Sequence, residues 1–448
     1  MTAPRDTRPP AVPATAQQGG EVLERWLWTE PAVWTERMLT ALEQGVKGDV
    51  WFRLIDKVFA ERNLRTATAK VVANHGAPGV DRETVEVFLG EVDSNVAKLT
   101  KALRDGSYEP QAIRRVYIPK PGSSEQRPLG IPTVRDRVVQ GAVRHVIEPI
   151  FEKEFATHSY GFRPGRGCKD ALRRVDALLK QGYVYVVDAD LKSYFDSIPH
   201  DRLLNRLRDR IADGRMLGLI ESFLKAGIMD GLEEWEPEAG APQGAVLSPL
   251  LSNIYLNPLD HCMAAQGFEM IRYADDFVIL CRSQAEAEHA LAMVRQWCEA
   301  EGLTLHPTKT TIVDVRIGGF DFLGYHFQTT RRGRLTCWPR KKSMQKFQDT
   351  IRAKTKRTNG HALMVIIAGV NRTLRGWFGY FQHSCRTTFV TVDGWVRMRL
   401  RSILRKRAGR QGRGRGRDHQ RWPNAFFADH GYFSLEAAFT AARQSPSG

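Results

Sequence analysis

Two adjacent acids, Asp275 and Asp276, separate an apolar run that begins at Ile271 from another that ends at Leu280. Apolar runs on both sides of a short polar break predict two strands joined by a tight turn, with the carboxylates at its tip. Neighbouring carboxylates repel each other and share a proton unless a divalent cation offsets their charge. The pattern therefore predicts a bound magnesium ion with a further ligand elsewhere. A surface turn is the alternative interpretation, because Asp-Asp pairs are common in hairpins.

An upstream segment offers a third carboxylate. The run Tyr183–Asp190 is typical of a buried strand that ends in acid, and a helix is predicted to begin near Pro199. Asp188 and Asp190 lie two residues apart, and therefore on the same face of that strand, so both are candidate ligands. One acid at the end of a strand and two in a hairpin form the ligand set of two-metal phosphoryl transfer.

The composition favours a polyanionic partner. The 448 residues include 66 Lys and Arg against 50 Asp and Glu, a formal net charge of +16. A basic surface binds phosphates with release of counterions, although an acidic membrane would also attract it. Because no apolar run reaches spanning length and no signal peptide opens the chain, we expect a soluble, intracellular protein without a membrane partner. The six cysteines form no Cys-x-x-Cys pair, which indicates neither a zinc ribbon nor a disulfide framework.

From about Gly76 to Phe327, the order of motifs resembles that of the reverse transcriptases encoded by bacterial group II introns. The motifs are, in order, Val116–Pro121, Arg127–Pro132, Asp136–Gln140, Ser159–Arg166, the strand ending at Asp190, Ala241–Leu250, the Asp275 hairpin, Gly302–Thr310 and Phe322–Tyr325. The resemblance implies an α+β fold of the right-hand polymerase type, with fingers and a palm built on an antiparallel sheet, followed by a helical thumb or maturase domain. It also implies a bacterial, cytoplasmic enzyme.

The resemblance assigns the catalytic groups. In that family the metal-binding aspartate lies five residues before an aromatic residue, here Phe195, which favours Asp190 over Asp188. Asp190, Asp275 and Asp276 would then be the catalytic residues and the ligands of two Mg²⁺ ions. Phe195 would press on the sugar of the incoming dNTP, where a 2′-hydroxyl would clash. A core phenylalanine is the alternative interpretation of that position.

The resemblance also implies contacts with the dNTP, the RNA template and the DNA primer. Lys120 and Arg127 would neutralise the triphosphate, and Gln243 would lie beside the nucleotide in a loop whose glycine permits close approach. Lys309 would face the phosphates or the primer end. Template or primer contacts are expected from Arg163, Arg166, Phe322, Leu323 and Gly324. The two arginines would hold the template backbone, a contact that positions without reading sequence.

Beyond Thr330 the chain becomes strongly basic. Residues 331–357 hold eleven Lys or Arg against one acid, Asp349, and residues 374–381 supply clustered aromatics. This stretch resembles the maturase domain of group II intron proteins, which doubles as the thumb, with Trp377, Tyr380 and Phe381 in its core. Residues 405–417 then carry seven cations in a Gly-rich frame, which suits either a phosphate-wrapping segment or a basic linker. The candidate RNA-binding residues are Arg375, Trp377, Arg410, Arg413, Arg415 and Arg417.

Five segments are expected along the chain. Residues 1–20 are typical of a disordered tail, 21–110 of an N-terminal helical extension of the fingers, 111–330 of fingers and palm, 331–404 of a thumb and maturase domain, and 405–448 of a basic nucleic-acid-binding segment. No Cys- and His-bearing endonuclease cluster follows, so we expect intron insertion to draw its primer from elsewhere.

These features predict an RNA-directed DNA polymerase that binds its parent group II intron RNA and assists splicing and mobility, with target-primed cDNA synthesis at a target DNA. A splicing cofactor with secondary polymerase activity and a domesticated reverse transcriptase in defence or repair are the alternatives. The intact acidic triad argues against a pure splicing cofactor, which has no need to keep it.

Overall fold

The computed structural model describes residues 24–119 and 126–444. Lys120 and the whole of the expected N-terminal tail, residues 1–20, lie outside these residues. The described chain divides into two compact units. The first contains the residues up to Val175, Val187–Cys281 and Ala285–Thr311, and the second contains Asp176–Val186, Arg282–Gln284 and the residues from Ile312 onward.

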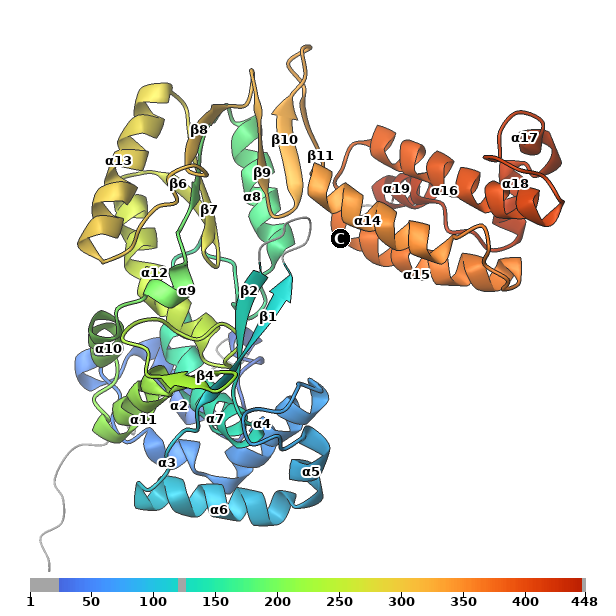
Figure 1. The fold of residues 1–448 in the computed structure, drawn as a ribbon. Coiled ribbons are helices and arrows are strands. Elements are labelled where there is room, and N and C mark those ends of the chain that lie inside the picture. The colour runs from blue at the N-terminus through green and yellow to red at the C-terminus, as the bar shows by residue number, and fades with distance from the viewer. Residues whose placement is uncertain (1–23, 120–125, 445–448) are drawn as a thin grey trace, which may run out of the picture. The chain divides into compact units, whose positions relative to one another are not determined.

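Helices form one layer of the first unit (Figure 1). They are α2 (Glu36–Gln44), α3 (Ile55–Val58), α4 (Glu61–Ala73), α5 (Val85–Gly90), α6 (Val92–Asp105) and α7 (Val134–Glu152). α7 is buried over nearly its whole circumference, because α3, α4, α5 and α6 all pack on it. The buried His145 ring ties α7 to α4, with Nδ1 2.8 Å from Asn63 Oδ1 and Nε2 2.8 Å from Lys70 Nζ.

The first sheet has the strand order β2-β1-β4-β5. Its strands are β1 (Ile113–Pro119), β2 (Gln126–Ile131), β4 (Ile228–Asp230) and β5 (Glu233–Trp235). β1 and β2 are antiparallel, and β1 and β4 are parallel. The sheet therefore joins segments that lie far apart in the sequence.

The second sheet has the order β6-β7-β3-β8. Its strands are β3 (Tyr185–Asp190), β6 (Glu269–Tyr273), β7 (Asp276–Cys281) and β8 (Thr311–Asp314). The helices in this part of the chain are α8 (Cys168–Lys180), α9 (Tyr194–Ser197), α10 (His200–Arg208), α11 (Gly214–Lys225), α12 (Ser248–Ala265) and α13 (Gln284–Ala300). Every residue from Phe277 to Cys281 is buried, which explains the continuous apolar run of β7. α12 packs directly on β6.

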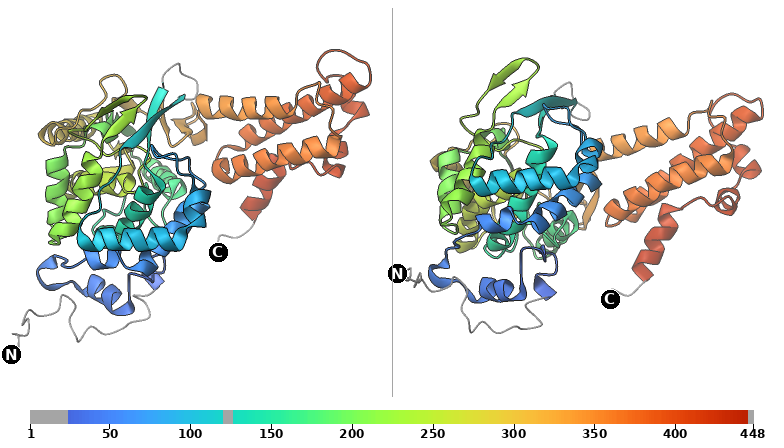
Figure 2. Two further views of the ribbon diagram at one scale, coloured as in Figure 1. Left: turned by 60° about the horizontal axis from the view of Figure 1, so that its bottom comes forward. Right: turned by 90° about the horizontal axis from the view of Figure 1, so that it is seen from below.

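The second unit contains a three-stranded sheet (Figure 1) and a group of helices (Figure 2). The sheet, of order β11-β10-β9, consists of β9 (Gly319–Phe322), β10 (Tyr325–Thr329) and β11 (Leu335–Pro339). The helices are α14 (Lys341–Lys354), α15 (Leu363–Phe381), α16 (Arg386–Arg407), α17 (Asp418–Arg421), α18 (Asn424–Asp429) and α19 (Leu435–Gln444). Both α15 and α16 pack on α19.

The expected α+β fold, with sheets among helices followed by a helical C-terminal part, is confirmed. None of the helices in the described ranges has both the length and the apolarity that crossing a bilayer requires.

Candidate active site

The acidic hairpin closes in a two-residue turn. Tyr273 at the end of β6 pairs with Asp276 at the start of β7, which leaves Ala274 and Asp275 as the turn. Ala274 has a φ of 60°, in the left-handed region that residues with a Cβ rarely occupy. A second loop presses on this turn, since a Cβ added at Gly161 would lie 2.2 Å from the Ala274 nitrogen. Contacts from outside the hairpin therefore hold the turn in this conformation.

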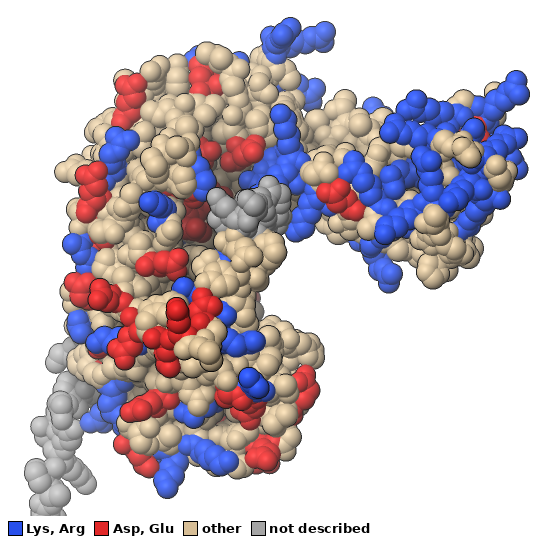
Figure 3. Space-filling model, viewed as in Figure 1, with Lys and Arg blue, Asp and Glu red and all other residues tan. Residues whose placement is uncertain are grey.

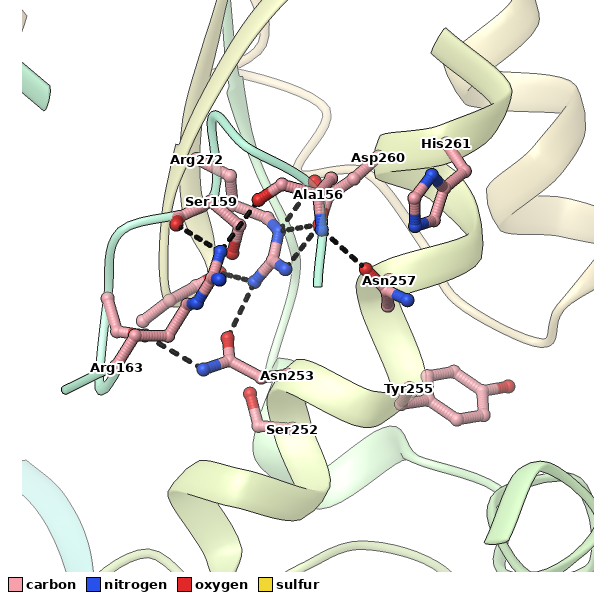
Figure 4. Close-up of polar contacts among 12 residues, drawn as sticks. Ala156, Ser159, Arg163, Ser252, Asn253, Tyr255, Asn257, Asp260, His261 and Arg272 are labelled. Atoms are coloured by element: carbon pink, nitrogen blue, oxygen red, sulfur yellow. Dashed lines mark hydrogen bonds and ion pairs between the residues drawn. The ribbon is translucent and has the colours of Figure 1, made fainter. Parts of the chain in front are cut away.

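Buried Arg272 anchors the hairpin to α12 (Figure 4). Its side chain is 0% exposed, and Nε donates to Asp260 Oδ1 at 2.8 Å. Nη1 donates to Asn253 Oδ1 and to the Ala274 carbonyl, both at 2.9 Å. Asn253 in turn donates to the Gly161 carbonyl at 2.8 Å. A buried guanidinium is tolerated only when acceptors surround it, so this network fixes both the turn and the loop that presses on it.

Two acidic segments meet at the turn. Burial raises the pKa of Asp275, and the negative charge of Asp190 raises this pKa further, whereas Arg127 and Arg272 lower it. β3, which ends at Asp190, and β7, which begins at Asp276, are hydrogen-bonded neighbours in one sheet. Arg127 is exposed on β2, opposite Ile118 of β1. The structure thus places Asp190 on the strand next to the hairpin of Asp275, and the positive charge of Arg127 lowers the pKa of the same Asp275 carboxyl.

Lys309 forms an ion pair with Asp190, with Nζ 2.6 Å from Oδ2. The lysine side chain is 61% exposed, so the pair contributes little to stability. The backbone at Asp190 is also held, since the His306 amide donates to its carbonyl at 2.7 Å. In this arrangement the Lys309 ammonium supplies positive charge directly beside a candidate metal ligand.

The donors at this turn suit a hard divalent cation, because carboxylate oxygens are its preferred ligands. A cation between Asp190 and Asp275 would remove the repulsion that raises the pKa of Asp275. Within residues 24–119 and 126–444, however, no three acidic, histidine or cysteine side chains are arranged to enclose a metal ion. Coordination by Asp190, Asp275 and half-buried Asp276 therefore requires side chains to move, including the release of Asp190 from Lys309.

A pocket opens beside Phe195, which follows the β3 strand. Its lining includes Arg115, Gly130, Phe195, Asp196, Gly240 and Gln243. Phe195 is only 9% exposed, so the same ring belongs to the core and forms part of the pocket wall. The two interpretations of Phe195 from the sequence are therefore compatible with each other.

The Gln243 loop is fixed against β2. The Gly130 amide donates to the Gln243 carbonyl at 2.6 Å. Gly244 has a φ of 105°, and an added Cβ would lie 2.4 Å from the Gly130 carbonyl oxygen, so only glycine fits. Gln140 of α7 accepts from the Val246 amide at 2.8 Å. These contacts hold Gln243 at the pocket.

The structure corrects the expectation for Arg163. Its side chain is 2% exposed, Nη2 pairs with Glu152 at 2.7 Å, and Nη1 donates to two carbonyls of its own loop. A guanidinium engaged in this way cannot reach a template phosphate, so Arg163 shapes the loop instead. Arg166 is more accessible: it donates to the Thr157 carbonyl and lies 5.9 Å from the Tyr160 ring centroid.

The second unit contains the predicted Phe322–Gly324 element in the β9–β10 hairpin. Phe322 pairs with Tyr325, which leaves Leu323 and Gly324 as the turn, with φ values of 45° and 82°. Phe322 is 1% exposed and belongs to the core, which corrects its expected contact with the primer. Leu323 and Gly324 remain partly accessible, and the Tyr380 hydroxyl donates to the Leu323 carbonyl at 2.7 Å.

The two candidate RNA contacts on α15 differ in accessibility. Trp377 is 8% exposed and its ring centroid lies 4.6 Å from that of Phe347, so it packs in an aromatic core and is not available to RNA. Arg375 is exposed and lies 5.2 Å from the Phe433 ring centroid. Only the arginine therefore remains a candidate for RNA contact.

Residues 409–417, the arginine loop, fold against α16. The Gly414 amide donates to Ser402 Oγ at 3.0 Å, and an added Cβ at Gly414 would lie 2.5 Å from Arg401 Cβ. Asp418, directly after the loop, pairs with Arg405 at 2.7 Å. The exposed side chains of this loop include Arg410, Arg413, Arg415 and Arg417. Figure 3 shows Lys and Arg gathered over the helices of this unit.

Reasoning from the sequence missed the support of the acidic turn. The sequence does contain a signal for the pair that supports this turn: Arg272 interrupts an apolar strand, and Asp260 interrupts a mostly apolar helix. A buried charge needs a partner, so two isolated charges in apolar elements are a candidate pair.

Two family models match the chain. A model described as reverse transcriptase (RNA-dependent DNA polymerase) matches residues 118–327, and one described as group II intron, maturase-specific domain matches residues 344–422.

Several proteins are similar to this chain. Protein YkfC of Escherichia coli (strain K12) is 35% identical over 347 residues, which cover 68% of this chain and 86% of that protein. The group II intron-encoded protein LtrA of Lactococcus lactis subsp. cremoris is 41% identical over 214 residues, covering 47% of this chain. The match spans only 35% of LtrA. Among solved structures, a partial Cas6-RT-Cas1–Cas2 complex has a TM-score of 0.36 at 28% identity, covering 55% of this chain and 43% of that one.

The acidic turn and most of the residues that line the Phe195 pocket lie within residues 118–327, which the reverse transcriptase model matches, and the maturase match follows them in the chain. The protein therefore belongs to the family of group II intron-encoded reverse transcriptases that carry a maturase domain.

Proposed function

We propose that the protein is an RNA-directed DNA polymerase that also binds its parent group II intron RNA to assist splicing and mobility. One observation carries the polymerase part: the Asp275 turn is held by the Arg272 side chain, and its strand β7 is the neighbour of β3, which ends at Asp190. The pocket lined by Phe195 and Gln243 supports the same proposal, because it offers a place for a nucleotide.

Divalent metal ions, which reverse transcriptases generally use, would be held by Asp190, Asp275 and Asp276. Two magnesium ions at these carboxylates would supply activation of the primer hydroxyl and stabilisation of the leaving pyrophosphate. The chain itself contributes positive charge from Arg127 and Lys309, which suits a polyphosphate.

The RNA-binding part rests on the maturase domain match and on the arginine loop. A folded loop that presents four arginines needs little ordering when it binds phosphates, so more of the interaction energy appears as affinity. LtrA, one of the similar proteins, is named as a group II intron-encoded protein, which supports intron RNA as the partner.

Primer extension on an RNA template, with dNTPs and magnesium, tests the polymerase assignment. Asp275→Asn keeps the shape of the side chain but removes its charge, so extension should fall to background while intron binding persists. Burial raises the pKa of Asp275, so the uncharged variant should melt at the same temperature as the wild type or higher. Asp209→Asn, an exposed acid on the same unit, is the matched control and should extend normally. Primer extension by Asp275→Asn at the wild-type level would contradict the polymerase assignment.

The pocket assignment is tested by sugar selection. Phe195→Val removes ring volume beside the nucleotide, so ribonucleotide incorporation should increase relative to dNTP incorporation. If a folded variant discriminates between the two as strongly as the wild type, Phe195 is a core residue alone.

A splicing cofactor with secondary polymerase activity is the second candidate, favoured by the exposed cations of the arginine loop. The Asp275→Asn variant separates the two roles. Splicing that persists without extension, together with loss of cDNA synthesis at the target DNA, would show that both activities belong to this protein and depend on different residues.

A further inference from the structure

An exposed phenylalanine stands next to the acidic turn. Phe162 is 44% exposed and has a φ of 60°. Bulky residues rarely adopt this left-handed conformation, because their Cβ crowds the following carbonyl. Exposure of the ring and strain in the backbone both oppose folding, and strained residues of this kind gather at functional sites.

The neighbours of Phe162 are immobilised on both sides. The Gly161 carbonyl accepts from Asn253 at 2.8 Å, and the Gly161 backbone is packed against Ala274. On the other side, buried Arg163 pairs with Glu152 at 2.7 Å. These contacts impose the backbone conformation of Phe162 and leave its ring at the surface. The loop is therefore a rigid support for an exposed aromatic group.

The support is attached to the catalytic turn itself. Phe162 directly follows Gly161, whose backbone packs against Ala274, and Ala274 precedes Asp275 in the turn. Because consecutive Cα atoms lie about 3.8 Å apart, the backbone of Phe162 is close to the turn. A polymerase must hold the paired primer end against these carboxylates for the reaction to proceed. An exposed apolar ring at this place would meet the nucleic acid.

We propose that Phe162 is a positioning residue that packs its ring against the sugar and base edges of the primer–template duplex beside the acidic turn. This inference rests on the proposed polymerase function. A phenyl ring has no hydrogen-bonding group, so its contact is independent of base sequence. Because the ring takes no part in the chemistry, it acts on the placement and retention of the duplex.

Two substitutions separate the ring from the strain. Phe162→Gly and Phe162→Asn remove the ring, and both residues tolerate a left-handed backbone, so the melting temperature should stay the same or rise. The Kd for a DNA primer on an RNA template, measured by fluorescence anisotropy without divalent ions, should rise roughly 5-fold to 100-fold, the value of one aromatic contact with a base. KM for the duplex should rise in parallel, with kcat at saturation near that of the wild type. Phe162→Trp should retain tight binding.

Phe52→Ala is the matched control, since Phe52 is a 54% exposed phenylalanine of the same unit. It should change neither Kd nor KM. If the folded Phe162→Gly and Phe162→Asn variants bind the duplex as tightly as the wild type, the inference is wrong. It is also wrong if affinity falls only in variants whose melting temperature has fallen. Binding is measured without polymerisation, so a wild-type protein that binds the duplex but fails to extend it would contradict the proposed function alone.

Discussion

The β6–β7 and β9–β10 hairpins both close in two-residue turns, but they are held by different forces. The turns also differ in backbone geometry, with a positive φ at Ala274 alone in the first and at both Leu323 and Gly324 in the second. The first is held by the buried Arg272–Asp260 pair. The second is held by tyrosine, with the Tyr380 hydroxyl donating to the Leu323 carbonyl.

The difference follows from what each turn carries. Asp275 is a half-buried carboxylate whose pKa is raised by burial, and the charge of Arg272 offsets part of that rise. The second turn carries no charge, and packed aromatic rings support it beside the hydrogen bond from Tyr380: the Tyr325 ring centroid lies 5.0 Å from that of Phe381. Removing a charge should therefore destabilise the β6–β7 hairpin more, and removing apolar volume should destabilise the β9–β10 hairpin more.

The largest effect is expected at the buried ion pair. Arg272→Met leaves Asp260 buried without its partner, which should lower the free energy of unfolding by about 3–5 kcal/mol. Primer extension should also be lost, because the Ala274 carbonyl loses its donor. Urea unfolding measures the first effect. The double variant Arg272→Met/Asp260→Leu should recover most of the stability but not the extension, and failure to recover stability would contradict the ion-pair explanation.

A smaller loss is expected in the aromatic clamp. Phe381→Ala removes a ring that is 7% exposed and contacts Tyr325, so the free energy of unfolding should fall by about 3 kcal/mol. Phe381→Leu should cost less than about 1.5 kcal/mol, because much of the volume is kept. Neither loss should depend on salt concentration. A strong salt dependence would mean that charge also holds this hairpin.

The first unit should also be the more sensitive to acid. Burial, together with the charges of Lys70 and Arg144, lowers the pKa of His145 to about 3. The unfolded chain takes up this proton near pH 6.5, so stability is lost as the pH falls below that value, by up to about 1.4 kcal/mol per pH unit. His145→Gln removes the titration. The variant should therefore lose less stability than the wild type between pH 7 and pH 5, and equal losses would exclude His145 as the cause.

The smallest effect on the fold is expected in the arginine loop. Replacing Arg410, Arg413, Arg415 and Arg417 by Gln removes exposed charges only, so the melting temperature should hardly change. Affinity for intron RNA should fall, and the slope of log affinity against log salt should become shallower by up to about 0.7 to 0.9 for each arginine that binds a phosphate in the wild type. Extension on a saturating preannealed duplex should stay near the wild-type level. An unchanged salt slope would show that the loop does not contact RNA.

Local sequence patterns were sufficient to predict several structural and chemical features of this protein. The apolar runs around Asp275 specify a hairpin because strands and tight turns depend on neighbouring residues. Gln243 was assigned only through the family resemblance, whereas the paired carboxylates and the basic C-terminal region could be recognised in the same way as the hairpin. Each depends on a short stretch whose chemistry does not require knowledge of distant partners.

Only the tertiary structure decided which long side chains face solvent. Arg163, Phe322 and Trp377 were expected to contact nucleic acid, yet all three are buried by residues that lie elsewhere in the chain. The pairing of Arg272 with Asp260 was hidden for the same reason, since a side chain's role depends on acceptors that folding brings to it. The exposed, left-handed position of Phe162 is the converse case: its two neighbours are fixed by α7 and α12, and this packing alone leaves the ring at the surface.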